Sequence, residues 1–446
     1  MEGVGTLRLP EGCKCESSIA QHFDYYGPIN VESVQQSFEE IKVTPSNGMS
    51  VEPYEFEFET PDNSFLLMNS LYLYCRARIV RANGSPVDMT NGPTADKVAP
   101  VNNLLMSMWK TIKTKVNDVT LNPSSAEHIP YKSMIETVLS VEGSDKNYTG
   151  GSLFFMDEAG KFNDMTVTPH SNAGFRARRD RSNQKGSFDM CGQITNDFLR
   201  SDNHLAPGNK LSLTFERSPD HFSLMTAGKE KFKIEIDELA VYGRRVKLFP
   251  EALRTVLGAK KEMERYLSSY TEIKEFPLQA SKLDWSVRLY SGVLPKQVII
   301  GMVSTKAKAG SYDTNPFLFD HFNIKRLNLK INGTRYPQEA YELDFEHNHF
   351  LREYINVFMN TGKYRINSGN CITPAHFAKG VTLFPFDLTP DQCDLFHTHA
   401  GRMGTLEIEM EWLKPLPEAV TVIAYSVFDQ VVTINGETIQ PETSLF

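Results

Sequence analysis

The chain has 446 residues, a length that suits two domains of about 200 residues each better than a single core. A formal net charge of −8, with 40% hydrophobic and 23% charged residues, is ordinary for a soluble globular protein and excludes a surface built throughout for nucleic acid. No stretch approaches 18 consecutive apolar residues, so no membrane span is predicted. The N-terminus lacks a basic flank followed by an apolar core, and we therefore expect no secretory signal.

The chain begins with an arm and continues into strands. Residues 1–48 show no sustained periodicity, which predicts an extended N-terminal arm. Apolar and polar residues then alternate over 54–59 and 71–79, a pattern typical of half-buried strands. The Asn83–Gly84 dipeptide after them predicts a turn.

One amphipathic helix and one long loop follow in the first half. Apolar residues over 131–139 recur at i, i+3, i+4, i+7 and i+8, which predicts a helix. Residues 142–190 are polar and glycine-rich, and we expect a long loop region there. Alternation returns at 211–217 and 232–242, which predicts two more strands.

The second half repeats features of the first half in the same order. KVNDVTLN at 115–122 resembles KRLNLKIN at 325–332, 210 residues later, and each octet is expected to end its strand at an asparagine turn. A second amphipathic helix is predicted at 351–358, and the strand around Leu211 recurs around Leu406. Three ordered similarities predict two copies of one β-rich module. Long connections between short strands favour Greek-key or jelly-roll sandwiches.

A charged segment joins the two copies. Pro250 suits a first helical turn, and the apolar residues that follow it predict a helical linker. The expected fold is all-β: two tandem jelly-roll β-sandwiches joined by that linker, with short helices in long loops. The expected segments are an N-terminal arm (1–48), a first jelly roll (49–249), the linker (250–271), a second jelly roll (272–436) and a C-terminal tail (437–446).

Catalytic and metal-binding motifs are weak in this sequence. His397 with His399, and His347 with His349, could share a metal if they lay on strands, as in a two-domain copper monooxygenase. A two-carboxylate glycosidase on a β-sandwich would take its acids from distant strands, and no spacing nominates them. A two-domain jelly-roll enzyme, such as a copper monooxygenase or an amidase, is the alternative from a different functional class. The six cysteines are scattered apart from Cys13–X–Cys. We expect no enzyme activity, cofactor or metal.

One basic cluster lies within the predicted loop region. Its members are Arg176, Arg178, Arg179, Arg181 and Lys185. Contact with nucleic acid or with an acidic neighbouring subunit is one interpretation, and a solvated loop is the other.

The sequence as a whole resembles double jelly-roll major capsid proteins. The resemblance rests on the runs FETPDNSFLLMNSLYLYCRARIVRANG, APVNNLLMSMWKTIKTKVNDVTLN, IPYKSMIETVL, LAPGNKLSLTFERSPDHFSLM, NPFLFDHFNIKRLNLKING and LPEAVTVIAYSVFDQVVTING. It covers roughly residues 45–436. Within that family the chain is most similar to capsid proteins of Polinton/Maverick elements and adintoviruses, in the adenovirus hexon lineage. The hexon's large tower insertions have no counterpart in this compact chain.

The resemblance implies a structural role without catalytic residues. Three chains would form a pseudo-hexagonal, homotrimeric capsomer, and capsomers would tile an icosahedral shell. The implied partners are further copies of the chain, penton or vertex proteins, minor capsid proteins and, weakly, packaged DNA. The implied location is the virion capsid, assembled inside the host cell. A minor or vertex capsid protein, or a capsid-derived protein kept by a host, is the alternative within the same fold.

Overall fold

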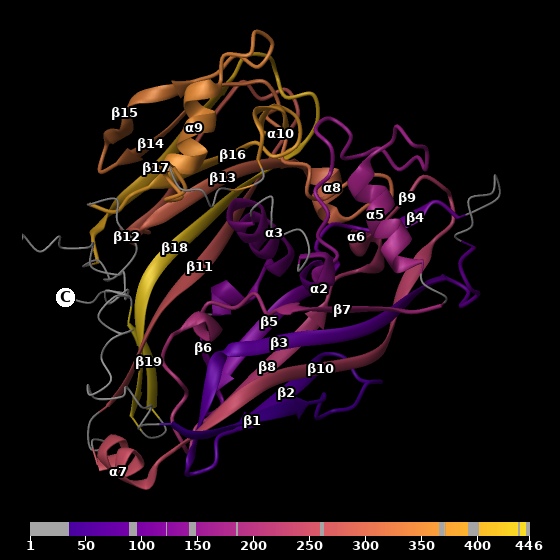
Figure 1. The fold of residues 1–446 in the computed structure, drawn as a ribbon. Helices are drawn as coiled ribbons and strands as arrows, with labels where there is room; N and C mark the ends of the chain where they lie inside the picture. Colours follow the sequence, from indigo (N-terminus) through magenta and orange to yellow (C-terminus); the bar gives the residue numbers. More distant parts are fainter. Residues whose placement is uncertain are drawn as a thin grey trace, which may run out of the picture.

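The computed structural model describes most of the chain after residue 34. The described residues are 35–88, 96–121, 123–141, 149–183, 186–258, 263–364, 370, 372–390, 401–435 and 438–442. Two β-rich modules lie side by side, the first at the lower right of Figure 1 and the second at the upper left. No helix among these residues is long and apolar enough to cross a membrane.

Among the described residues, ten strands belong to the first module and nine to the second. The first module contains β1 (Gln35–Val43), β2 (Tyr54–Glu59), β3 (Ser64–Arg81), β4 (Val98–Pro100), β5 (Trp109–Val116), β6 (Val119–Leu121), β7 (Phe188–Gln193), β8 (Lys210–Arg217), β9 (Leu224–Thr226) and β10 (Phe232–Leu248). The second contains β11 (Glu264–Leu278), β12 (Asp284–Val293), β13 (Gln297–Ser304), β14 (Ile324–Ile331), β15 (Thr334–Glu342), β16 (Leu383–Asp387), β17 (Met403–Trp412), β18 (Val420–Asn435) and β19 (Thr438–Glu442).

Short helices occupy the connections between strands. They are α2 (Leu104–Ser107), α3 (Ile129–Ser140), α5 (Ala173–Ser182), α6 (Asp220–Ser223), α7 (Pro250–Gly258), α8 (Thr305–Ala309), α9 (Leu351–Met359) and α10 (Pro374–Ala378), with 3₁₀ turns η1 (Pro123–Ala126), η2 (Gly150–Ser152) and η3 (Phe198–Arg200). The two helices predicted from amphipathic spacing are α3 and α9. Because the modules are built of strands and the helices are short, the predicted all-β class is confirmed.

The two modules have the same strand order. In the first module the sheets run β1-β10-β3-β7 and β2-β8-β5-β6, and in the second they run β11-β18-β13-β16 and β12-β17-β14-β15. We call the first sheet of each module the β10 sheet and the β18 sheet. Neighbouring strands are antiparallel throughout. Strand β19 pairs with β18 as a fifth strand of the β18 sheet. Two packed antiparallel sheets with these crossovers form a jelly roll, so each module is one.

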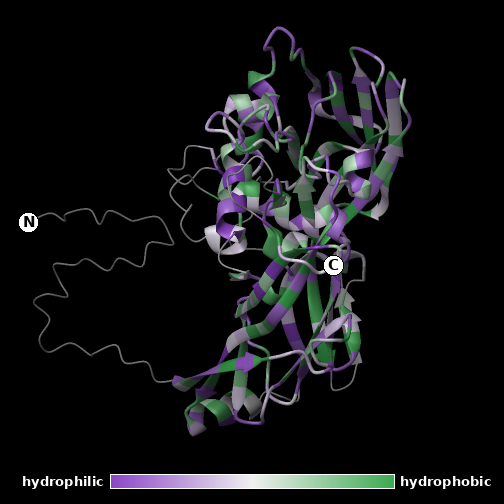
Figure 2. Ribbon diagram, turned by 90° about the vertical axis from the view of Figure 1, so that its right-hand side faces the viewer, coloured by the Kyte–Doolittle hydropathy of each residue, from purple (hydrophilic) through white to green (hydrophobic). Residues whose placement is uncertain are grey.

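Position by position, this order shows which elements correspond. β1 takes the same place as β11, β10 as β18, and the β5–β6 hairpin as the β14–β15 hairpin. Helix α3, between β6 and β7, corresponds to α9, between β15 and β16. Hydrophilic and hydrophobic residues alternate along the strands in Figure 2, because each strand turns one face to its sandwich core.

The first strand of each module lies in a segment that the sequence analysis assigned otherwise. Strand β1 occupies the end of the predicted arm, so the first jelly roll begins at Gln35 rather than at residue 49. Strand β11 occupies the second half of the predicted linker, where the helix ends at Gly258 and the strand begins at Glu264. Both are edge strands that pair on one side only, and their polar residues hid the strand alternation.

Three further predictions were wrong in detail. Part of the predicted loop region 142–190 is helix α5. This helix is rich in charged residues and has no apolar stripe, so its sequence shows no helical periodicity. Part of the predicted C-terminal tail is β19, which pairs with β18. The equivalent hairpin turns are Asn117–Asp118 and Asn332–Gly333, 215 residues apart, so the octet similarity was five residues out of register. The first turn lies inside its octet, and Asn122 lies outside the described residues.

The two hydrophobic cores extend across the boundary between modules. The cluster that fills the second jelly roll also takes in α3 and Phe175 of α5. The cluster that fills the first jelly roll takes in Tyr266 of β11, Val432 of β18 and Ile439 of β19. The modules therefore share cores and do not merely touch.

Candidate assembly surfaces

The surface where the modules meet, here called the module junction, is built by α3 and η3 of the first module against β11 and β18 of the second. Tyr131 of α3 packs edge-on against Phe317 and Phe319, with ring centroids 5.8 and 6.3 Å apart. His128, just before α3, lies 3.0 Å from the carboxylate of Glu275 on β11. Nine of the twelve residues of α3 are buried, because the helix has the first module on one side and the second on the other.

A buried ion pair lies at the centre of the module junction. The Lys132 ammonium donates to Asp197 Oδ2 at 2.6 Å, and both side chains are almost fully buried. Asp197 also accepts from the backbone N–H of Thr271 at 2.7 Å and from Ser125 Oγ at 3.0 Å. Burial alone would raise the pKa of Asp197, but the Lys132 charge and these hydrogen bonds hold it below its usual range. One carboxylate thus links α3 of the first module to β11 of the second.

A second polar group crosses the same junction on the next turn of α3. Glu136 forms an ion pair with Arg200 of η3 and accepts a hydrogen bond from the Tyr425 hydroxyl of β18 at 3.0 Å. Burial raises the pKa of Tyr425 well above its usual value, so this hydroxyl stays a donor. These partners lie far apart in the sequence, and no spacing signal could have linked them.

The predicted basic cluster divides into buried and exposed members. Arg178 and Arg179 are 0% and 2% exposed, so they cannot present a surface to nucleic acid or to another subunit. For these two residues the predicted contact role is wrong: α5 turns them into the protein, where charges need partners. Arg176 and Arg181 are partly exposed, and their contact role stays a prediction. Lys185 lies outside the described residues.

Arg178 instead ties the modules together at a second point. Its Nη1 donates to Asp157 Oδ1 at 2.9 Å, and its Nε donates to the Pro100 carbonyl at 2.9 Å. The other oxygen of Asp157 accepts from Asn315 Nδ2 of the second module at 3.1 Å. The buried arginine therefore holds a carboxylate that reaches across the junction.

The histidine pairs show no metal geometry in the described part of the chain. His347 bonds to Asp344 at 2.7 Å in the turn before α9, and the His347 and His349 rings lie 6.2 Å apart. No group of three or more potential ligand side chains gathers anywhere among the described residues. His397 and His399 lie outside the described residues.

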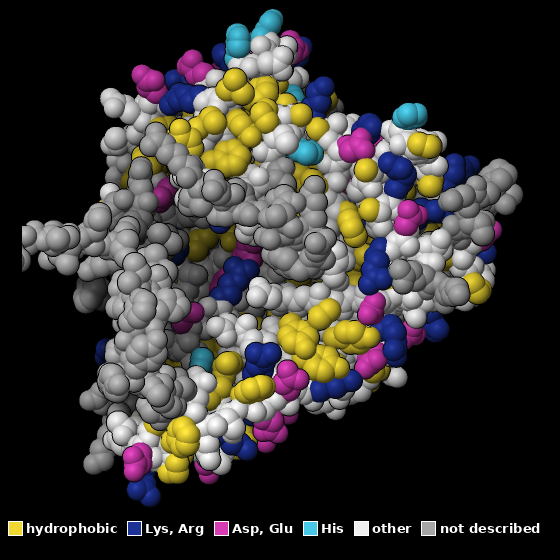
Figure 3. Space-filling view, in the orientation of Figure 1, with side chains coloured by type: hydrophobic (Ala, Val, Ile, Leu, Met, Phe, Trp, Pro, Cys, Tyr) yellow, Lys and Arg dark blue, Asp and Glu magenta, His cyan; other side chains and the backbone are white. Residues whose placement is uncertain are grey.

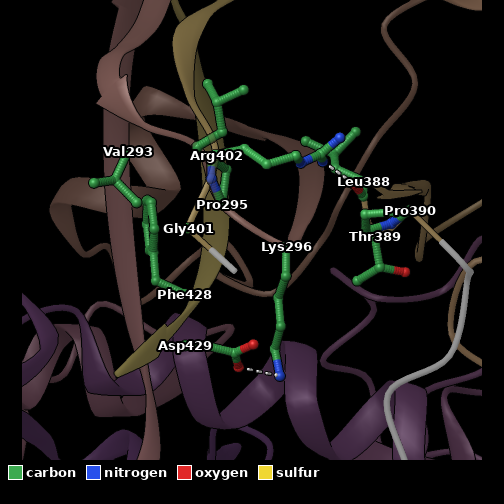
Figure 4. Close-up of a pocket in the computed structure, with 11 residues that line it drawn as sticks. Val293, Pro295, Lys296, Leu388, Thr389, Pro390, Gly401, Arg402, Phe428 and Asp429 are labelled. Atoms are coloured by element: carbon green, nitrogen blue, oxygen red, sulfur yellow. Dashed lines mark hydrogen bonds and ion pairs between the residues drawn. The ribbon is translucent and has the colours of Figure 1, made fainter. Parts of the chain in front are cut away.

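A small cavity lies between the end of β12 and the middle of β18 and is drawn in Figure 4. Lys296 and Asp429 form an ion pair of 2.9 Å at its lower side, and Arg402 donates to the Leu388 carbonyl at its upper side. The cavity holds about 30 Å³. That is room for a water molecule but not for an organic substrate.

Two exposed apolar surfaces lie on the face shown in Figure 3. Hydrophobic side chains gather over α9 and over the β3–β10 region of the first module. The first surface, here called the α9 stripe, consists of Leu351, Ile355 and Met359, which are 58%, 38% and 52% exposed. Spacing at i, i+4 and i+8 places them on one side of the helix. The sequence analysis predicted an apolar face over 351–358, which did not include Met359, and could not tell that Leu351 and Ile355 lie at the surface.

The second surface, here called the tyrosine face, lies on the outer side of the β10 sheet. Tyr72 and Tyr242 stack with ring centroids 5.4 Å apart, and Tyr74 meets Tyr242 edge-on at 6.3 Å. Tyr72 is 39% exposed, and Phe38 of neighbouring β1 is 67% exposed. Exposed aromatic groups of this size are typical of protein contact surfaces.

Comparison with known proteins agrees with this architecture. A chain in the cryo-EM structure of the Sputnik virophage superposes with a TM-score of 0.67 at 11% identity, covering 100% of this chain and 94% of that one. The mavirus major capsid protein gives 0.53 at 11% identity, covering 100% and 97%. The faustovirus major capsid protein gives 0.55 at 10% identity, covering 92% of each chain. The chain has the double jelly-roll fold.

Sequence comparison adds one distant relative of this double jelly-roll chain. An uncharacterized protein of Caenorhabditis elegans is 25% identical over 394 residues, which cover 86% of this chain and 91% of that protein. No family model matches the sequence.

Proposed function

We propose that the protein is a structural subunit of an icosahedral viral or virus-like shell. The observation that carries the proposal is the double jelly-roll fold over the whole described chain, which the major capsid proteins of mavirus and faustovirus share. The superposition covers most of this chain and most of each capsid protein, so both jelly rolls of this chain have a counterpart in them. The proposed role is mechanical and needs no catalytic group.

Three chains would build one capsomer in this proposal. Two jelly rolls in each chain give six in the ring, which makes a trimer approximately hexagonal in outline. A contact repeated head to tail closes into such a ring when each copy is rotated by one third of a turn. Shared cores and buried ion pairs at the module junction support it, because a shell subunit must keep its two jelly rolls at a fixed angle under load.

The finer assignments belong to the same proposal. The lineage is that of Polinton/Maverick and adintovirus capsid proteins, related to the adenovirus hexon. The location is the virion capsid, and the partners are neighbouring capsomers, penton or vertex proteins and minor capsid proteins. Arg176 and Arg181 remain candidates for contact with packaged DNA or with a neighbouring subunit.

A second candidate function comes from the nematode relative. Similarity over 91% of a Caenorhabditis elegans protein favours an origin in an animal genome, where a capsid-derived chain could be kept by its host. The fold is the same for both candidates. They differ in whether the chain still assembles.

The mass and shape of the purified protein test the proposal. We expect a mass near three times 50.5 kDa by light scattering, and capsomers of hexagonal outline by electron microscopy that pack into sheets or shells. A trimer that never packs further would favour the host-retained protein. A strict monomer at high concentration, without capsomers in the images, would contradict both the trimer and the shell.

A further inference from the structure

The corresponding helices of the two modules are buried to very different degrees. Helix α3 of the first module has nine of twelve residues buried, because it lies on the β18 sheet of the second module. Helix α9 has the same place in the second module, yet only Glu353 and Val357 of its nine residues are buried. Its apolar stripe faces outward. The fold therefore leaves one of two equivalent helices uncovered among the described residues.

The corresponding sheet faces also differ, but here the face of the second module is covered and the face of the first module is not. The outer face of the β18 sheet presents Thr271, Ile273 and Tyr425, and the module junction buries all three. The outer face of the β10 sheet presents the tyrosine face, and no described residue of the same chain covers it as α3 covers its counterpart. Among the described residues, each chain therefore leaves one helix stripe and one sheet face uncovered.

We propose that the α9 stripe of one chain docks on the tyrosine face of a second copy. This contact would repeat the α3 contact of the module junction between chains instead of within one chain. The inference rests on the proposed capsid function, which supplies the reason for a closed ring, but the pairing follows from the two uncovered surfaces themselves. Each chain offers one helix and one sheet face, so the contact is head to tail, and the proposed capsomer requires it to close after three copies.

The α9 stripe and the tyrosine face are chemically complementary. The α9 stripe is aliphatic and carries no charge, and the tyrosine face offers flat aromatic rings with hydroxyls at their edges. Charges stand around the rings: Lys42 Nζ lies 5.5 Å from the centre of the Tyr242 ring and pairs with Glu238. An apolar centre with a polar rim is the usual anatomy of a specific protein interface.

Charge substitutions on each surface test the pairing. The helix variant carries Leu351→Glu and Ile355→Glu, and the sheet variant carries Phe38→Glu and Tyr72→Glu. All four side chains are exposed, so the isolated fold should tolerate the changes. The matched control is Met403→Glu, an equally apolar residue of β17 that is 68% exposed and lies on neither surface.

Sedimentation velocity should give a trimer for the wild type and the control and a monomer for each variant. We expect the association of each variant to be weaker by about 100-fold or more, since each variant changes two residues that are expected to be hot spots of the contact. An equimolar mixture of the two variants should form a 1:1 dimer and stop there. In that mixture one intact helix meets one intact sheet, and the remaining pair carries like charges.

The outcomes separate this inference from the proposed function. A trimeric wild type with trimeric helix and sheet variants would overturn the pairing and leave the capsid proposal standing. A mixture that stays monomeric would overturn the head-to-tail arrangement. A wild type that is monomeric at every concentration would overturn the proposed function and the inference with it.

A footprint on the unmodified chain covers the case in which a variant fails to fold. Cys191 of β7 is exposed and pairs in register with Tyr74, so it lies on the tyrosine face. Its alkylation, followed by peptide mass spectrometry, should be at least about ten-fold slower at concentrations where the trimer forms than after dilution to monomer, as expected for burial of a thiol in an interface. Equal rates in the two states would contradict the docking.

Discussion

At the scale of single residues, buried charged groups join the two jelly rolls, and we expect them to fix the angle between the modules. Lys132 and Asp197 are both nearly fully buried, and Asp197 also binds the backbone of β11. A buried ion pair adds little net stability compared with apolar packing, but breaking one is costly. Its use here is geometric: a carboxylate with several donors accepts one arrangement of α3 and β11 and rejects displaced ones.

The Lys132–Asp197 pair gives the first residue-scale prediction. Asp197→Asn leaves the Lys132 charge buried without a counter-ion, so we expect the free energy of unfolding to fall by about 3–5 kcal/mol. Lys306→Met is the matched control, because its pair with Asp313 is more than half exposed on both sides. That change should cost at most about 1 kcal/mol. Urea titration of both variants measures the difference, and equal losses would contradict the argument.

The same pair predicts a pH dependence. The folded-state pKa of Asp197 lies below its ordinary value of about 3.9. Its stabilisation is therefore fully present above that ordinary value and is lost as the pH falls through the lower folded-state pKa. The stability gap between wild type and Asp197→Asn should shrink below about pH 4. A gap that is constant from neutral pH down to pH 2 would refute this role.

Glu353 gives a prediction of opposite sign. Its side chain is buried in α9, its Oε1 has no hydrogen-bond partner among the described residues, and Arg352 lies 4.0 Å away. Burial raises the pKa of Glu353. Glu353→Gln should therefore stabilise the protein at neutral pH by about 1 kcal/mol, and the gain should vanish as acid protonates the wild-type carboxyl. Thermal unfolding measures it, with exposed Glu339→Gln as a neutral control.

At the scale of elements, the equivalent hairpins of the two modules have the same turn conformation but different turn residues. Asn117 and Asp118 join β5 to β6 with φ of 45° and 65°, and Asn332 and Gly333 join β14 to β15 with φ of 50° and 82°. Two successive residues in the left-handed region make the two-residue turn that suits a twisted hairpin. Asparagine, aspartate and glycine tolerate that region best, so the turn identity survives where the strand letters do not.

Gly333 supplies the element-scale prediction. Gly333→Ala places a Cβ on a left-handed residue and should cost about 1 kcal/mol of folding free energy, although nothing lies within 4 Å to clash with it. Gly228→Ala is the control, because that glycine is not in the left-handed region and its nearest neighbour is 3.6 Å away. Chemical denaturation of both should show a loss at position 333 only. A similar loss at both positions would mean that space, not backbone conformation, decides.

At the scale of the whole molecule, the two jelly rolls share their hydrophobic cores. The cluster in the second module includes α3 and Phe175 of the first, and the cluster in the first module includes Tyr266 and Val432 of the second. Neither module can lose its packing without exposing apolar surface of the other. The polar contacts through Asp197 and Asp157 add to this coupling.

We therefore expect the modules to unfold together. Trp109 lies in the first module, and Trp285 and Trp412 lie in the second. Trp109→Phe leaves reporters in the second module, and a Trp285→Phe/Trp412→Phe variant leaves one in the first. Urea unfolding followed by fluorescence should show each tryptophan changing in step with the far-ultraviolet circular dichroism of its own variant. Separate midpoints for local and global signals would show that the shared cores do not couple the modules.

The sequence alone determined much of this description, and the reason is local chemistry. Alternation predicted β2, β8 and β17, helical spacing predicted α3 and α9, and Asn332–Gly333 marked the β14–β15 hairpin. The order of these features was enough to indicate a duplicated jelly roll. Edge strands β1 and β11 escaped notice, because an edge strand with one solvated side needs no apolar alternation.

Only the tertiary structure decided which surfaces are covered. The α3 and α9 patterns look alike as sequence, yet α3 lies against the other module and α9 faces outward. The arginines of α5 look like a basic surface as sequence, yet Arg178 is a buried partner of Asp157. Burial depends on residues hundreds of positions away, which spacing cannot encode. The physical reason is that periodicity reports which side of an element is apolar, and the folded chain decides what that side meets.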